Sequence, residues 1–244
     1  MSGPDLIVQD AEGAEGDARD YKVALKHFAH GVLDPLVRAL LALGLNADHL
    51  TTFGFVLSLA AGLEFATGRF RLAATLATAA GLCDILDGQL ARRTGGETKF
   101  GAFLDSTLDR IAEAAILVGF AWFYLFNLVD MVTNPDRVLN NLQRGLEPVT
   151  FAAIAMVTVL ALVGSFMVSY TRARAEGLGL DCKVGWFERP ERMVLIIIMG
   201  FAGYGWVIPA GLLVLMTFSF ATAFQRMAHV WRNTRETGSD STEA

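Results

Sequence analysis

The sequence predicts an all-α integral membrane protein with six transmembrane helices, preceded by an N-terminal amphipathic helix in the membrane interface. Three observations predict this fold class. Hydrophobic residues make up 53% of the 244 residues and charged residues only 18%, against about 25% charged in an ordinary soluble protein. Apolar runs of about 20 residues, the length that crosses a bilayer core, recur along the chain. Basic residues are shared unevenly between the connecting loops, as in multi-pass membrane proteins.

The two ends of the chain differ in charge from its middle. Residues 1–20 carry six acids and one base, and residues 233–244 carry three acids and one base. Of the 25 acids and 20 bases in the whole chain, the middle therefore keeps 16 acids and 18 bases. We expect an acidic flexible tail at 1–19, a membrane domain at 20–232 and a polar C-terminal tail at 233–244. So weak a basic excess predicts no nucleic-acid partner.

Each helix follows from the pattern of apolar residues. In the segment 20–43, apolar residues such as Leu25 and Phe28 recur at helical spacing among basic ones, which is typical of a helix at the membrane surface. Spans are expected near 49–67, 72–92, 100–126, 149–172, 190–204 and 207–229. As one helix, the uncharged stretch 193–225 would be roughly 50 Å long, too long for one crossing. Its glycines and Pro209 predict a turn within it.

The basic residues predict the orientation in the membrane. Six spans place both termini on the same side. Only four of the 20 Lys and Arg residues lie in loops of the opposite side: Arg69, Arg71, Arg137 and Arg144. Because basic residues collect on the cytoplasmic side, we expect a multi-pass protein of the cell membrane. Both termini and the functional inner ends of the spans would then lie in the cytoplasm.

Four aspartates lie in segments that otherwise have the composition of membrane helices: Asp84, Asp87, Asp105 and Asp109. A carboxylate at membrane depth costs a few kcal/mol or more, so it indicates a function. Spacings of three and four residues place each pair on one face of its helix. If the two faces meet, four like charges share a small volume and need cations. Hard divalent ions are the expected partners, Mg²⁺ first and Mn²⁺ as an alternative.

Small residues and an arginine accompany the aspartates. Gly88 and Ala91 share the face of the first pair, and Gly101 lies one turn before the second pair. A glycine lets a ligand or another backbone come close, and tight helix packing is the alternative explanation. Arg92, at the end of the first helix, has the planar fork that holds a phosphate. Glu113, one turn after the last aspartate, is expected either to support the site or to pair with an arginine.

The residues between the two pairs complete a specific motif. Residues 84–110 read DILDGQLARRTGGETKFGAFLDSTLDR, which matches D-x-x-D-G-x-x-A-R, eight residues, then G-x-x-x-D-x-x-x-D. This pattern resembles the signature of the CDP-alcohol phosphotransferases, integral membrane enzymes of phospholipid synthesis. The resemblance extends over about residues 30–232, and it implies six membrane helices after a surface helix and a homodimer.

The resemblance also implies roles for individual residues. Asp84, Asp87 and Asp105 resemble the ligands of a two-metal centre, here two Mg²⁺ ions. Asp109 resembles the catalytic base, which also touches a metal. It would take the proton of the acceptor hydroxyl as that oxygen attacks the β-phosphorus of the CDP-lipid and CMP leaves. The positions that resemble CDP-lipid contacts are Asp48, Thr51, Gly88, Ala91, Arg92, Thr98 and Gly101.

The first two of these positions come from a second segment that is similar to the family. Residues 44–54 read GLNADHLTTFG, which resembles the family pattern G-x-x-P-N-x-x-T-x-x-G. Thr51 and both terminal glycines match, whereas Ala47 and Asp48 stand in place of the usual Pro and Asn. Asp48 is therefore carried over at a position where this sequence departs from the pattern.

Three further segments narrow the acceptor. GAFLDSTLDR at 101–110, SYTRARAE at 169–176 and ERPER at 188–192 are similar to the bacterial phosphatidylinositol phosphate synthases within this family. That likeness implies CDP-diacylglycerol as donor and inositol 1-phosphate as acceptor. Arginines at the inner ends of the spans suit an acceptor with its own phosphate, and the candidates are Arg172, Arg189, Arg192 and Arg226. Alternatively, they orient the protein in the membrane or pair with Glu176, Glu188 and Glu191.

Two other functions stay open on the sequence. Glycerol 3-phosphate as acceptor would keep the same chemistry. A divalent-cation transporter would also use intramembrane aspartates, but it predicts acids along a path from both faces. Here the four aspartates lie toward the inner ends of the spans. Metal-supported release of CMP separates the enzyme from the transporter.

Overall fold

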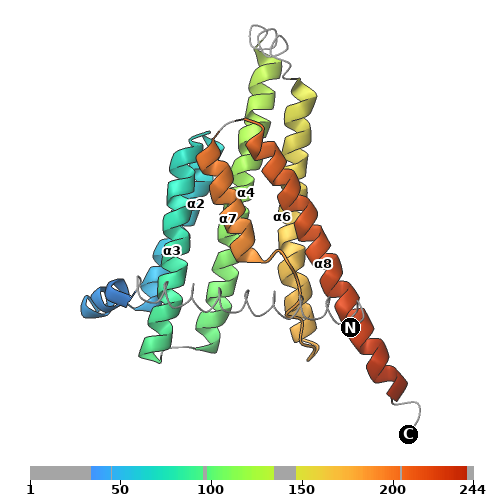
Figure 1. Ribbon diagram of the computed structural model, residues 1–244. Coiled ribbons are helices and arrows are strands. Elements are labelled where there is room, and N and C mark those ends of the chain that lie inside the picture. Colours follow the sequence, from blue (N-terminus) through green and yellow to red (C-terminus); the bar gives the residue numbers. More distant parts are fainter. Residues whose placement is uncertain (1–33, 45, 96–97, 135–146, 204, 241–244) are drawn as a thin grey trace, which may run out of the picture. The chain divides into compact units, whose positions relative to one another are not determined.

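Most of the described residues are helical. The computed structural model describes residues 34–44, 46–95, 98–134, 147–203 and 205–240, and no strand occurs among them. The long helices are α2 (Ala47–Ala66), α3 (Phe70–Thr94), α4 (Lys99–Thr133), α6 (Pro148–Glu176), α7 (Arg189–Ala202) and α8 (Val207–Asp240) (Figure 1). A helix lies at each of the six stretches expected to span the membrane. Of the surface helix expected at 20–43, residues 20–33 lie outside the described part, and 34–42 are helical.

Four helices are long and apolar enough to cross a membrane: α2, α4, α6 and the Val207–Arg235 part of α8. The protein is therefore a helical membrane protein. The other two helices differ in charge or length. α3 carries two aspartates and two arginines in its last turns, and α7 has only 14 residues, about 21 Å at 1.5 Å per residue. The count of six crossings stays a prediction.

The uncharged stretch 193–225 is broken as expected. α7 ends at Ala202, and Gly203 follows with a φ of 81°, a positive value that favours glycine. α8 begins at Val207 and has Pro209 in its first turn, where the missing N–H of proline is harmless. Two helices joined by a glycine turn thus replace one over-long helix.

α4 and α8 continue furthest past the ends of their apolar runs. α4 runs to Thr133 rather than 126, and α8 runs to Asp240 rather than 229. An apolar run marks the membrane core, whereas capping groups decide where a helix ends. At the end of α4, the backbone N–H of Asn134 donates to the carbonyl of Asp130 at 3.1 Å. The polar stretch expected as a tail at 233–244 is helical as far as Asp240.

The chain forms two compact units. The first unit contains residues up to Leu50 and Ile85–Glu97. In its described part, Asp34 at the start of the helix 34–42 forms ion pairs with Arg38 and with Arg93 of α3. The second unit contains Thr51–Asp84 and Thr98–Ala244, and it holds all of α4, α6, α7 and α8.

Aromatic stacking and close backbone contact build the core of the second unit. α6 packs against both α4 and α8, and α7 packs against α8 (Figure 1). Phe120 of α4 stacks on Phe65 and Phe70, with ring centroids 4.2 and 6.2 Å away. A Cβ built on Gly119 would lie 2.2 Å from the backbone oxygen of Gly62. α2 and α4 therefore meet backbone to backbone, as small residues allow in membranes, and this contact holds the helix that carries Asp105 and Asp109.

Candidate active site

Three of the four predicted aspartates share one small volume in the second unit. Asp84 lies on α3, and Asp105 and Asp109 lie one turn apart on α4. One carboxylate oxygen of each lies within 4.8 Å of the other two. All three side chains are half-buried, so their charges are close together in a poorly solvated place.

The fourth aspartate, Asp87, lies one turn after Asp84 on α3. Its side chain is buried, with 6% of its surface exposed. It belongs to the stretch of α3 that is part of the first unit. The spacing of three residues places Asp84 and Asp87 on the same face of this helix.

The acidic cluster fits a divalent cation. Asp105 Oδ1 is buried and finds no hydrogen-bond donor among the described residues. A buried carboxylate oxygen without a donor is costly, whereas it is the ligand that Mg²⁺ and Mn²⁺ prefer. The three aspartates therefore have the chemistry, the spacing and the unsatisfied oxygen that a metal site needs.

Arg189, the first residue of α7, reaches this cluster. Its Nη1 lies 2.8 Å from Asp84 Oδ2 and its Nη2 lies 2.6 Å from Asp109 Oδ1. The guanidinium thus bridges two helices of the acidic cluster with charge-assisted contacts. Its Nε is buried and has no acceptor among the described residues.

Arg192, one turn further along α7, pairs with Glu113 of α4. Arg192 Nε and Nη2 donate to the two carboxylate oxygens of Glu113 at 2.5 and 2.8 Å. The exposed fractions of the two side chains are 1% and 4%. Of the two roles expected for Glu113, the structure shows pairing with an arginine, and this pair holds α7 against α4.

Glu188 forms ion pairs with the other two arginines, Arg226 and Arg172. Its Oε1 lies 2.6 Å from Arg226 Nη2 and 3.6 Å from Arg172 Nη1. Arg226, on α8, also donates from Nε to the carbonyl of Val184 and from Nη1 to that of Val168. Arg172, on α6, donates to Glu176 at 2.9 Å. The sequence indicated Glu188 only as one possible arginine partner. Its position immediately before α7, among arginines, is the feature that could have predicted this role.

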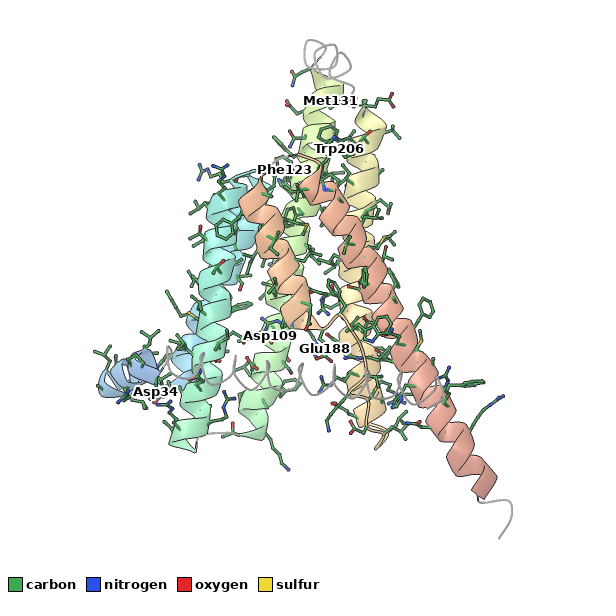
Figure 2. All side chains as sticks on the ribbon, viewed as in Figure 1. Asp34, Asp109, Phe123, Met131, Glu188 and Trp206 are labelled. Carbon is green, nitrogen blue, oxygen red and sulfur yellow. The ribbon has the colours of Figure 1, made fainter. Side chains whose placement is uncertain are left out.

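All four predicted arginines line one cavity of about 680 Å³ together with two of the aspartates. The cavity lies between α4, α6, α7 and α8, and Asp109 and Glu188, both labelled in Figure 2, are among its lining residues. Its charged residues are five arginines and five carboxylates. They are Arg110, Arg172, Arg189, Arg192 and Arg226, with Asp105, Asp109, Glu113, Glu176 and Glu188. Arg174, two residues from Arg172, is not among its lining residues.

The predicted CDP-lipid residues occupy several places. Gly88, Ala91 and Arg92 follow Asp87 on α3 in the first unit, where Arg92 is exposed. Asp48 is exposed in the first turn of α2, and Thr51 is half-buried. Thr98 and Gly101 also have a structural role at the start of α4. Thr98 caps the helix, and its Oγ1 accepts a hydrogen bond from the backbone N–H of Gly101 at 2.9 Å.

The matched family accounts for this arrangement. The family model for CDP-alcohol phosphatidyltransferases matches residues 45–225, which include the motif, α2, α3, α4, α6 and α7 and most of the cavity. The chain belongs to the CDP-alcohol phosphatidyltransferase family. It is therefore an enzyme of this family rather than a cation transporter.

Two named relatives indicate which branch of the family this chain resembles. Over 203 residues the chain is 36% identical to the archaetidylinositol phosphate synthase of Methanothermobacter thermautotrophicus, covering 82% of this chain and 89% of the relative. Over 207 residues it is 33% identical to the phosphatidylinositol phosphate synthase of Mycobacterium tuberculosis, covering 82% and 86%. Both relatives are inositol phosphate lipid synthases, one archaeal and one bacterial.

Solved structures of the mycobacterial enzyme have the same fold. The phosphatidylinositol phosphate synthase of Mycobacterium tuberculosis with CDP-DAG bound superposes with a TM-score of 0.67 at 32% identity, covering 81% of this chain and 92% of that one. The same enzyme in complex with manganese and citrate also gives 0.67 at 32% identity, covering 81% and 88%. The structures of that relative therefore contain CDP-DAG in one case and manganese and citrate in the other.

Proposed function

We propose that this enzyme transfers a phosphatidyl group from a CDP-lipid, CDP-diacylglycerol, to inositol 1-phosphate and releases CMP. The cavity that joins the aspartate cluster to five arginines carries this proposal. An acceptor hydroxyl needs a base beside it, and an acceptor phosphate needs arginines a few ångströms further on. Asp109 and the arginines line the same cavity. The likeness to inositol phosphate lipid synthases supports the same acceptor.

In this proposal the aspartates hold the metal and move the proton. Asp84, Asp105 and Asp109 would bind a divalent cation, with Asp87 completing a centre of two Mg²⁺ or Mn²⁺ ions. When bound, the metal stabilises negative charge on the phosphoryl oxygens. Asp109 accepts the proton of the acceptor hydroxyl as a new O–P bond forms at the β-phosphorus. The bond between the two phosphates of the CDP-lipid breaks, and CMP leaves.

The arginines would hold the phosphate that the acceptor already carries. A phosphomonoester has a charge of about −1.5 to −2 near pH 7. Arg172, Arg189, Arg192 and Arg226 line one cavity, and forked guanidinium groups suit a phosphate. A choline or ethanolamine acceptor would carry no phosphate to use them.

The donor lipid would lie against the motif on α3 and the start of α4. We assign its CDP group to Gly88, Ala91, Arg92, Thr98 and Gly101, and to Asp48 and Thr51 of α2. Glycines leave room for a ligand to come close, and Arg92 has an exposed guanidinium; both features support this assignment. We further propose six crossings, with both termini and the cavity in the cytoplasm, and a homodimer.

The experiment is CMP release by purified protein with CDP-diacylglycerol and Mg²⁺. Inositol 1-phosphate and glycerol 3-phosphate are supplied separately at equal concentrations, and EDTA gives the metal-free control. Release with inositol 1-phosphate and little or none with glycerol 3-phosphate supports the proposal. Release with glycerol 3-phosphate alone contradicts the acceptor, and release that is unchanged by EDTA contradicts the metal chemistry.

A further inference from the structure

Arg189 differs from the other cavity arginines in its partners. It bridges Asp84 and Asp109, which are candidate metal ligands, whereas Arg192 pairs with Glu113 and Arg226 with Glu188. We propose that Arg189 is the internal counter-cation of the metal site before metal binds. Metal binding then releases it to hold the acceptor phosphate, so that metal and acceptor bind with positive coupling. This inference rests on the proposed function.

The geometry makes Arg189 and a metal ion compete for the same two carboxylates, those of Asp84 and Asp109. The nitrogens of Arg189 lie 2.8 and 2.6 Å from Asp84 Oδ2 and Asp109 Oδ1. These carboxylates lie with Asp105 in the cluster whose oxygens converge within 4.8 Å. A guanidinium does not lose its proton in a protein, so it cannot make room by becoming neutral. A divalent cation placed among the three aspartates therefore repels it.

The guanidinium of Arg189, once released from the aspartates, can stay in the cavity that it already lines. Arg189 lines the cavity together with Arg172 and Arg226, and its buried Nε has no acceptor among the described residues. The partners of Arg172, Arg192 and Arg226 lie outside the aspartate cluster, such as the carbonyls of Val168 and Val184 for Arg226. Arg189 is thus the arginine whose present partners are the ones that metal binding takes away.

The charge balance of the cavity predicts that metal and acceptor phosphate strengthen each other's binding. Its lining holds five arginines and five carboxylates, so it offers no net positive charge to a phosphate. A bound divalent cation adds two positive charges and frees one guanidinium. The acceptor phosphate should therefore bind more tightly after the metal, and by linkage the metal should bind more tightly after the acceptor.

The test measures Mn²⁺ binding without any CDP-lipid, so that no turnover occurs. Free Mn²⁺ is followed by EPR during titration of the full-length protein in detergent, with wild type compared with Arg189→Gln. We expect the variant to bind Mn²⁺ roughly tenfold or more tightly, within the usual range of coupling between sites. Arg189→Lys keeps the charge but loses the fork, so its affinity should fall between the two. Arg174→Gln, an exposed arginine of α6 outside the cavity, is the matched control and should match wild type.

A second titration measures the coupling itself. Binding of inositol 1-phosphate to wild type is measured with and without saturating Mn²⁺, and we expect it to tighten roughly tenfold with the metal. In Arg189→Gln the metal should change acceptor affinity much less. Unfolding temperatures show that each variant is folded, and Arg189→Lys carries the test if the glutamine variant is not.

The outcomes separate the inference from the proposed function. Equal or weaker Mn²⁺ binding by Arg189→Gln and by Arg189→Lys overturns the counter-cation role, while metal-dependent CMP release by wild type would leave the proposed function intact. If Mn²⁺ does not change the affinity of wild type for inositol 1-phosphate, the inference is also overturned. If wild type binds no Mn²⁺, both the inference and the metal centre of the proposed function fail.

Discussion

Asp109 belongs to the aspartate cluster and also lines the cavity that contains the arginines. It lies one turn from Asp105 on α4, and Arg189 contacts its Oδ1. Asp109→Asn keeps the size of the side chain but removes the proton acceptor. We expect CMP release to fall by at least about 10²-fold, the usual contribution of a general base. Mn²⁺ binding, measured on the same sample, should weaken much less than turnover, because Asp84 and Asp105 keep their carboxylates. Full activity in this variant would contradict the assignment of the base.

The sequence predicts the residues of the cluster better than their partners. Helical spacing alone places Asp105 and Asp109 on one face, and the motif singles out Asp84 with them. The pairing of Arg189 with two aspartates and of Arg192 with Glu113 depends on how α7 lies against α3 and α4. That placement is set by side-chain packing far from the motif, which spacing within a single helix does not report.

At the scale of helices, the Glu113–Arg192 pair joins α4 to α7 within the second unit. Both side chains are almost fully buried, so removal of one partner leaves an uncompensated charge. We expect Glu113→Leu or Arg192→Met alone to lower the free energy of unfolding by about 3–5 kcal/mol. The double variant should regain much of this loss, because it leaves no charge unpaired. Denaturant unfolding in detergent measures all four proteins, and a double variant no better than the worse single one would argue against the pair.

The contact between α2 and α4 gives a second prediction for the helices. A Cβ at Gly119 would lie 2.2 Å from the backbone oxygen of Gly62, so Gly119→Ala should push the helices apart and destabilise the protein by about 1–3 kcal/mol. Gly81→Ala is the matched control, because a Cβ there meets nothing within 4 Å. It should be neutral or stabilise by up to about 1 kcal/mol. Equal unfolding temperatures for both variants would contradict the close contact.

Helix ends show where sequence patterns stop being informative. The glycine turn after α7 was predictable, because glycine and proline act locally on the backbone. The continuation of α4 to Thr133 and of α8 to Asp240 was not, because hydropathy marks the membrane core and not the last hydrogen bond. Hydropathy also does not fix the ends of α7. This helix has 14 residues, and its crossing of the membrane stays a prediction.

For the whole molecule, the uneven distribution of basic residues predicts which loops face the cytoplasm. Trp186, before α7, and Trp206, before α8, are equally exposed at 78%. In a background without Cys83 and Cys182, single cysteines at these positions report the two sides. An impermeant maleimide added to intact cells should label Trp206→Cys and not Trp186→Cys, and both should react after the membrane is opened. The reverse pattern would invert the topology, and labelling of both in intact cells would contradict a crossing by α7.

The central claim is that one cavity holds the metal beside Asp84, Asp105 and Asp109 and the acceptor phosphate beside the arginines. Anomalous scattering from crystals grown with Mn²⁺ and inositol 1-phosphate, without CDP-lipid, tests it most directly. We predict a manganese peak coordinated by these aspartates and the acceptor phosphate in contact with at least two of Arg172, Arg189, Arg192 and Arg226. A manganese peak elsewhere, or a phosphate bound outside this cavity, would contradict the account.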